Sequence, residues 1–93
     1  MILSFADRET ERIWNGEVSR RLPIAIQAIA RRKLRMINNA RQLDDLRIPP
    51  ANRLEALRGD MKGRHSIRVN VQWRICFRWS IAGVTDVQIL DYH

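Results

Sequence analysis

A chain of 93 residues has room for one compact core, which excludes a multidomain architecture, and the predicted single domain covers residues 1–93. Hydrophobic residues make up 45% and charged residues 29% of the chain, which excludes a disordered tail. The net charge is +7 at pH 7 and 15 of the 17 basic residues are arginine, a balance that favours nucleic acid or an acidic protein as the partner.

The N-terminal half predicts one short strand and two helices. Residues 2–5 form an apolar run typical of a first strand, and Asp7 can cap a helix over residues 8–14 that ends before Gly16. Pro23 fits the first turn of a second helix, in which apolar residues recur at helical spacing. These apolar residues are Ile26, Ile29, Ala30, Leu34 and Ile37.

The C-terminal half predicts a sheet, preceded by a short helical turn over residues 43–46 and a connector at Pro49-Pro50. The predicted strands cover residues 53–57, residues 65–70, residues 73–79 and a final stretch with Thr85, Val87 and Ile89 buried. Short turns join consecutive strands, so the pairing is expected to be antiparallel. The predicted fold class is α+β: an N-terminal strand, two helices, then a mainly antiparallel four-stranded meander with the helices on one face.

Arginine alternates with apolar residues along the predicted strands. Arg68, Arg74 and Arg78 are expected on one face of the sheet, open to solvent because the helices cover the other face. Such a face can hold phosphate groups. Alternatively, Asp86 and Gln88 on the next strand can pair with these arginines, and the two interpretations carry equal weight.

RNA can be cleaved without a metal ion. A base removes the proton of the 2′-hydroxyl, a cation stabilises the phosphate and an acid protonates the departing 5′-oxygen. Arginine can supply only the cation. The candidate proton carriers are Glu55, Asp60, His65, Asp91, Tyr92 and His93. The sequence has no Gly-rich phosphate loop and no zinc-binding pattern, and its two histidines and one cysteine are too few to predict a metal site.

Tyr92 and His93 close the sequence. Terminal residues are more often frayed surface than site, but the patterned strand before them is expected to hold them at the sheet edge. There Tyr92 can stack on a base, and the imidazole of His93, a group that titrates near neutral pH, can carry a proton.

Cys76 lies in the middle of a predicted strand and is expected to be a small packed residue. A lone cysteine cannot form an internal disulfide, which suits a reducing compartment. No apolar run is long enough to cross a membrane, and the first residues lack a signal-peptide pattern. The sequence therefore predicts a cytoplasmic protein without membrane contacts.

Four stretches of the sequence resemble the HigB toxins, the plasmid-maintenance killer branch of the RelE/ParE toxin superfamily. They are residues 52–60, 66–70 and 72–79 and the closing Asp91-Tyr92-His93, and the similarity extends over the whole chain. The resemblance implies a compact RelE/ParE-like fold and ribosome-dependent cleavage of mRNA in the ribosomal A site. It also implies a HigA-like helix-turn-helix antitoxin, through which alone the toxin would meet operator DNA.

The resemblance also assigns the site. The implied catalytic residues are Glu55, Arg58, Arg74, Asp91, Tyr92 and His93. RNA phosphate binding is expected of Arg53, Lys62, Arg68 and Arg78. Some relatives have histidine at the position of Glu55 and lysine at that of Arg58, and arginine holds charge without moving a proton. Proton transfer is therefore expected mainly from Asp91 and His93, and Glu55 can still serve as a base if it lies near the 2′-hydroxyl.

Two other functions fit the same sequence. A ParE-like toxin would bind DNA gyrase without being an enzyme, and it would induce the DNA damage response while sparing protein synthesis. A plain basic module would bind ribosomes or RNA in a salt-sensitive manner and produce no new mRNA ends.

Overall fold

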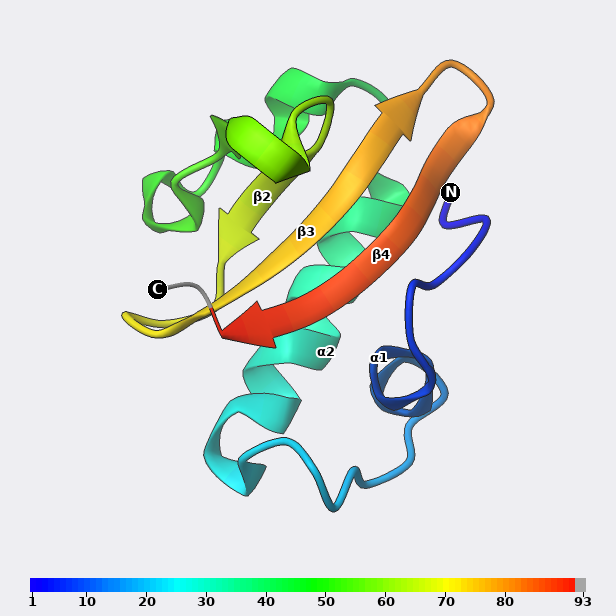
Figure 1. Ribbon diagram of the computed structural model, residues 1–93, viewed down its shortest axis with the longest axis vertical. Helices are drawn as coiled ribbons and strands as arrows, with labels where there is room; N and C mark the ends of the chain where they lie inside the picture. The colour runs from blue at the N-terminus through cyan, green and yellow to red at the C-terminus, as the bar shows by residue number, and fades with distance from the viewer. Residues whose placement is uncertain (92–93) are drawn as a thin grey trace.

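Residues 1–91, which the computed structural model describes, form two helices followed by a four-stranded antiparallel sheet (Figure 1). The sheet order is the chain order, β1-β2-β3-β4. The elements are α1 (Arg8–Trp14), α2 (Ile24–Asn39), β1 (Glu55–Ala56), β2 (His65–Arg68), β3 (Trp73–Ser80) and β4 (Gly83–Asp91). Short 3₁₀ helices at Leu43–Arg47, Pro50–Asn52 and Gly59–Met61 connect them. The predicted α+β fold is therefore confirmed.

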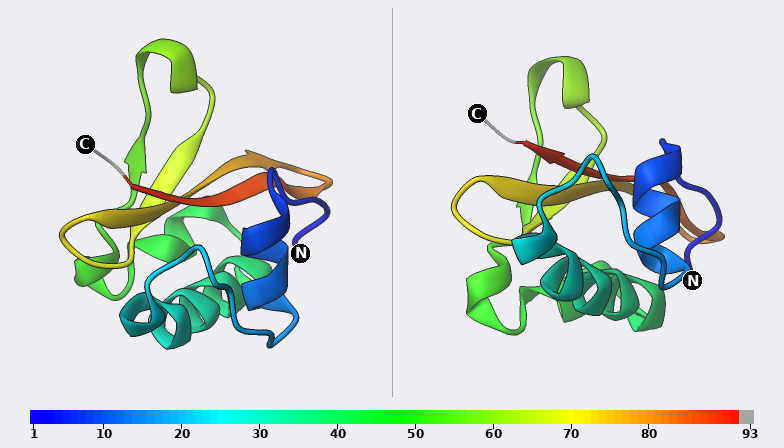
Figure 2. Two further views of the ribbon diagram at one scale, coloured as in Figure 1. Left: turned by 60° about the horizontal axis from the view of Figure 1, so that its bottom comes forward. Right: turned by 90° about the horizontal axis from the view of Figure 1, so that it is seen from below.

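Both helices pack against one face of the sheet, and the segment around Gly59–Met61 rises on the other side (Figure 2). The core lies between the two layers. Its fully buried members include Ile13, Ala30, Leu34, Ile37, Ile67, Ile75, Phe77 and Val87. The predicted apolar stripe of α2 is confirmed, because its residues line this core. Within residues 1–91, neither helix combines the length and the apolar character needed to span a membrane.

Helix α1 begins and ends where the sequence predicts. The side chain of Asp7 caps it by accepting a 2.7 Å hydrogen bond from the backbone nitrogen of Thr10. The Thr10 hydroxyl in turn accepts a 2.9 Å hydrogen bond from the backbone nitrogen of Ile89. The first turn of α1 is therefore tied directly to β4.

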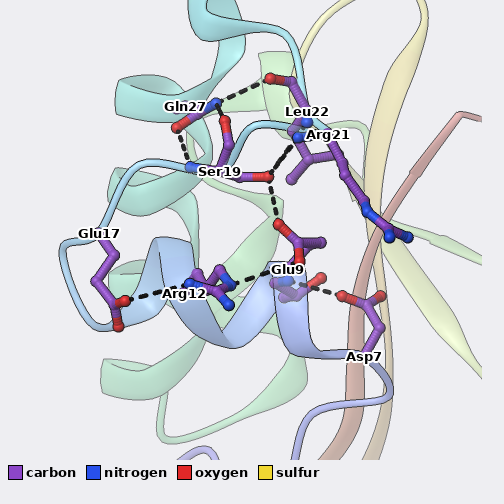
Figure 3. Close-up of polar contacts among 9 residues, drawn as sticks. Asp7, Glu9, Arg12, Glu17, Ser19, Arg21, Leu22 and Gln27 are labelled. Atoms are coloured by element: carbon purple, nitrogen blue, oxygen red, sulfur yellow. Dashed lines mark hydrogen bonds and ion pairs between the residues drawn. The ribbon is translucent and has the colours of Figure 1, made fainter.

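Ser19 organises the loop between the two helices (Figure 3). Its hydroxyl donates a 2.7 Å hydrogen bond to Glu9 of α1 and accepts from the backbone nitrogens of Arg21 and Leu22. The amide side chain of Gln27 in α2 donates to the carbonyls of Ser19 and Leu22. Because Ser19 is buried, these bonds satisfy polar groups that water cannot reach.

The predicted N-terminal strand is reduced to two isolated parallel bridges with β4, at Ile2 and Phe5. Between them, the Ser4 hydroxyl accepts a 3.0 Å hydrogen bond from the backbone nitrogen of Asp86. Asp86 has a φ of 54° and lies where β4 departs from regular pairing with β3, so a continuous ladder cannot form there.

The same irregularity corrects the predicted facing of β4. Val84, Val87 and Ile89 are buried, whereas Thr85, which the sequence placed on the buried side, is only half-buried. The pairing register shifts between Cys76 and Arg78 of β3, which marks a β-bulge. An extra residue reverses the alternation on one side of the bulge, so strict period-two counting fails.

β1 is shorter than the strand predicted over residues 53–57. Arg53 has a φ of 46°, in the left-handed region, which interrupts extended backbone. The preceding residue, Asn52, is fully buried, and its side-chain amide donates to two backbone carbonyls of the connector at 3.1 and 3.4 Å. These bonds fix the connector, and regular pairing begins only at Glu55.

Candidate functional site

Arg74 lies on the predicted sheet face but is buried there, so the expectation that this arginine is open to solvent was wrong. Its side chain is only 9% exposed. The Nε atom donates a 2.7 Å hydrogen bond to the hydroxyl of Ser66, and Nη2 donates a 2.6 Å hydrogen bond to the carbonyl of Arg53. The chain entering β1 therefore covers the guanidinium and fixes its orientation.

Glu55 of β1 is an acidic neighbour of Arg74. Its Oε1 atom lies 3.5 Å from Nη2 of Arg74, and its side chain is 49% exposed. Glu55 also pairs directly with Ser66 across the β1–β2 ladder, so both residues face the same side as Arg74. The Glu55 carboxylate therefore contacts both the buried guanidinium of Arg74 and solvent.

Arg58 lies three residues after Glu55, at the start of the 3₁₀ helix Gly59–Met61. Its side chain is exposed, and its extended backbone precedes Gly59, whose φ of 63° turns the chain. A hollow of about 580 Å³ is lined, among the described residues, by the segment from Glu55 to Arg58. Glu55 and Arg58 therefore line one shared opening.

Asp91 ends β4 and is paired with Trp73 in the sheet. Its Oδ2 atom accepts a 2.9 Å hydrogen bond from the side chain of Gln72. Because Arg74 follows Trp73 in β3, Asp91 lies at the same end of the sheet as Arg74. Tyr92 and His93 lie outside the described residues, so their predicted roles stay predictions.

The four predicted phosphate-binding residues lie in different surroundings. Arg78 forms an ion pair with Asp86 at 3.2 Å. The sequence allowed this pairing as the alternative to phosphate binding. The Nε atom of Arg68 donates to the carbonyl of Asn70 at 3.0 Å. Arg53 and Lys62 are exposed. In the part of the chain that the structure describes, ion pairing therefore distinguishes Arg78 from the other three.

Cys76 is buried, and His65 packs against an aromatic ring. Burial raises the pKa of the Cys76 thiol, against the lowering effect of Arg74 and Arg64, so the group stays protonated at neutral pH. The ring of His65 stacks on that of Phe77, with the two ring centroids 6.4 Å apart. Among residues 1–91, no three His, Cys, Asp or Glu side chains gather as metal ligands would.

Ser66 is the positioning residue that sequence reasoning missed. It is fully buried and provides both its hydroxyl and its carbonyl, the latter at 3.4 Å, to the Arg74 guanidinium. The available signal was its alternation with Ile67, which places a small polar residue beside the arginines of the neighbouring strand. That signal does not distinguish a solvated serine from a buried hydrogen-bond partner.

The arrangement combines a fixed positive charge with an accessible carboxylate. Arg74 and Arg58 can stabilise negative charge but cannot exchange protons, whereas Glu55 can accept one. The buried position of Arg74 strengthens its electrostatic effect relative to a solvated arginine. A substrate with a phosphate next to an ionisable hydroxyl matches these groups.

Comparisons with known proteins cover most or all of the chain. Toxin HigB-1 of Vibrio cholerae serotype O1 is 43% identical over 94 residues, which cover 100% of this chain and 98% of that toxin. An uncharacterized protein of Haemophilus influenzae is 36% identical over 78 residues, or 84% of this chain and 76% of that protein. The sequence model of the family described as "RelE-like toxin of type II toxin-antitoxin system HigB" matches residues 3–93. This chain therefore belongs to the RelE-like HigB toxins of type II toxin-antitoxin systems, and an antitoxin is its partner.

Proposed function

We propose that this toxin is a ribosome-dependent endoribonuclease that cleaves mRNA in the ribosomal A site and so stops translation. It acts in the cytoplasm, and a HigA-like helix-turn-helix antitoxin neutralises it and carries all contacts with operator DNA. The observation that supports the proposal is the half-exposed carboxylate of Glu55, 3.5 Å from the buried guanidinium of Arg74. Arg58 lines the same hollow as Glu55.

The proposed reaction is an internal transesterification. The 2′-oxygen loses its proton to a base and attacks the adjacent phosphorus, while the bond from phosphorus to the 5′-oxygen breaks. The products are a 2′,3′-cyclic phosphate and a 5′-hydroxyl that has received a proton from an acid. Arg74 and Arg58 stabilise the additional negative charge on the phosphate during attack. This scheme requires neither a metal ion nor an organic cofactor.

The proton-transfer roles fall to the acidic and imidazole groups. Glu55 is positioned beside the guanidinium of Arg74 and can act as the base. Asp91 orients His93, which protonates the leaving oxygen, and Tyr92 stacks on a base of the mRNA. Arg53, Lys62, Arg68 and Arg78 would hold neighbouring backbone phosphates.

Expression in bacteria followed by mapping of mRNA 5′ ends tests the proposal. The wild-type chain should generate new ends inside translated codons, each with a 5′-hydroxyl. Glu55→Gln, which keeps the size of the side chain but removes its charge, and a variant lacking His93 should each abolish these ends. Arg47→Gln is the matched control, because Arg47 is an exposed arginine paired with Asp44 on the 3₁₀ helix Leu43–Arg47.

Other outcomes would point to other activities. Growth arrest with a DNA damage response and continuing protein synthesis would replace the proposal by gyrase binding. Ribosome binding and arrested translation without new mRNA ends would replace it by a non-cleaving RNA-binding module. Cleavage that survives both Glu55→Gln and loss of His93 would retain the activity and overturn the residue assignment.

A further inference from the structure

A second hollow, of about 370 Å³, is lined in part by Arg53, the residue whose carbonyl accepts a hydrogen bond from Arg74. We call it the Lys33 hollow. It is lined by Lys33, Ala51, Arg53, Arg68, Val69, Asn70 and Val71. Three of these residues are cationic and none is acidic, so the lining carries positive charge from three separate parts of the fold.

Within residues 1–91, the three cations of this hollow form no ion pair with an acidic side chain. Among the described residues, neither Lys33 nor Arg53 nor Arg68 forms an ion pair, whereas Arg12, Arg47, Arg74 and Arg78 all do. Like charges gathered without counterions repel one another, which costs folding free energy unless an anion binds between them. The charge pattern therefore fits a site for an anionic ligand.

Lys33 is held in place inside the hollow. Its ammonium group donates a hydrogen bond to the side-chain oxygen of Asn52, and Asn52 is anchored through its amide to the carbonyls of Leu46 and Ile48. Partial burial, reinforced by the charge of Arg32, lowers the pKa of Lys33. An anion at the hollow would offset both effects and favour the charged ammonium.

The backbone of Arg53 connects this hollow to the candidate site. Its carbonyl accepts the 2.6 Å hydrogen bond from Arg74, and Arg53 is also one of the residues that line the Lys33 hollow. Arg68 is paired with Arg74 across the β2–β3 ladder. Its Nε atom is fixed by the carbonyl of Asn70, another residue of the lining. A polyanion crossing Arg53 would therefore meet both sites in succession.

We infer that the Lys33 hollow binds a backbone phosphate of the same single-stranded RNA whose scissile phosphate lies at Arg74. The inference rests on the proposed function for the identity of the ligand. Lys33 and Arg68 clamp the non-bridging oxygens of a phosphate neighbouring the cleaved one, and Arg53 separates the two phosphates. This contact supplies affinity and register and takes no part in the chemistry.

Titration of the full-length toxin with a fully 2′-O-methylated oligoribonucleotide tests the inference, because this RNA has no 2′-hydroxyl with which to react. Backbone amide shifts in nuclear magnetic resonance spectra should concentrate at Lys33, Ala51, Asn70 and Val71. Lys33→Gln and Arg68→Gln should each weaken binding about tenfold. Each should also reduce the slope of log affinity against log salt by about 0.7, as expected for loss of one single-strand phosphate contact.

Arg20→Gln is the matched control, since it removes one exposed positive charge from the loop between the helices. It should leave both the affinity and the shift pattern unchanged. Equal weakening by Arg20→Gln and Arg68→Gln would overturn the inference in favour of diffuse charge attraction. Lys33→Gln removes the hydrogen bond to Asn52 and could prevent folding. In that case Arg68→Gln alone still tests the inference.

Titration with inorganic phosphate separates a strand-binding site from a simple anion site. Shifts at the same residues with inorganic phosphate but none with the oligonucleotide would overturn the RNA assignment. The binding experiment is independent of cleavage. Binding at the hollow without new mRNA ends in cells would sink the proposed function alone, and cleavage with unchanged RNA binding in the hollow variants would sink this inference alone.

Discussion

The Nε atom of Arg74 donates a 2.7 Å hydrogen bond to the hydroxyl of Ser66, and both residues are buried. A buried guanidinium without its acceptors would face a large desolvation penalty. Ser66 therefore determines where the charge of Arg74 is held, although it need not contact a substrate.

We expect Ser66→Ala to lower the free energy of unfolding by about 1–3 kcal/mol, because Nε of Arg74 loses a buried acceptor. Toxicity should fall as well, since the guanidinium can then rotate away from Glu55. Urea unfolding and growth after induction measure the two effects. Ser80→Ala, which removes an exposed hydroxyl bonded to the Gly83 carbonyl, should leave toxicity intact. Equal effects from both variants would contradict the role given to Ser66.

We expect Arg74→Lys to reduce toxicity although the charge is kept. A lysine ammonium lacks the planar fork that bonds the Ser66 hydroxyl and the Arg53 carbonyl together. Cell viability after induction checks this, with circular dichroism to establish that the variant folds. Arg47→Lys, at an exposed ion pair, is the control for a charge-conserving change. Full toxicity of Arg74→Lys would show that charge alone is sufficient at this position.

Gly83→Ala should destabilise the protein more than Gly16→Ala does. Both glycines have positive φ, 147° and 84°, so either substitution carries a backbone cost of about 1–2 kcal/mol. A Cβ at Gly83 would in addition lie 2.8 Å from the Leu3 side chain and the Met1 carbonyl, whereas one at Gly16 meets nothing within 4 Å. Thermal melting of the two variants compares these costs, and equal losses would mean that the N-terminal segment moves aside.

Asp45 should make stability depend on pH in the acid range. Its Oδ2 atom accepts hydrogen bonds from the backbone nitrogens of Gln42 and Arg41 at 3.0 and 2.9 Å, and these lower the pKa of the carboxyl below its ordinary 3.8. A carboxyl with a depressed pKa contributes stability above pH 3.8 that is lost as the pH falls through the lower, folded-state value.

Melting temperatures at pH 7 and pH 2 check this linkage. Asp45→Asn should be less stable than wild type at pH 7, and the difference should shrink toward pH 2 as the wild-type carboxyl takes up its proton. Asp44→Asn is the control, because Asp44 lies on the same 3₁₀ helix but bonds to the Arg47 side chain and to neither of those backbone nitrogens. A constant difference between Asp45→Asn and wild type would contradict the capping role.

Local sequence signals predicted those elements that local interactions determine. The Asp7 cap and the apolar residues after it gave the bounds of α1, and alternation along β3 gave the core positions Ile75 and Phe77. Short connections between strands gave the antiparallel meander. In each case the decisive contacts lie within one element or across one turn.

Features that depend on distant contacts were missed. The bulge at Asp86 is supported by Ser4, and the burial of Arg74 depends on the carbonyl of Arg53. Neither contact changes the alternation of apolar and polar residues along a strand, so the sequence pattern does not reveal it. For the site, strand alternation predicts the arginines, side-chain chemistry predicts Glu55 as a proton carrier, and the resemblance assigns the catalytic roles. The buried anchor at Ser66 and the cationic hollow at Lys33 depend on contacts that only the folded chain shows.

The hydrogen bond from the backbone of Asp86 to Ser4 spans 82 residues of sequence. The N-terminal segment consequently has no partner strand until β4 has been synthesised and has emerged from the ribosome. A nascent chain thus lacks its completed sheet edge for almost the whole of its own translation.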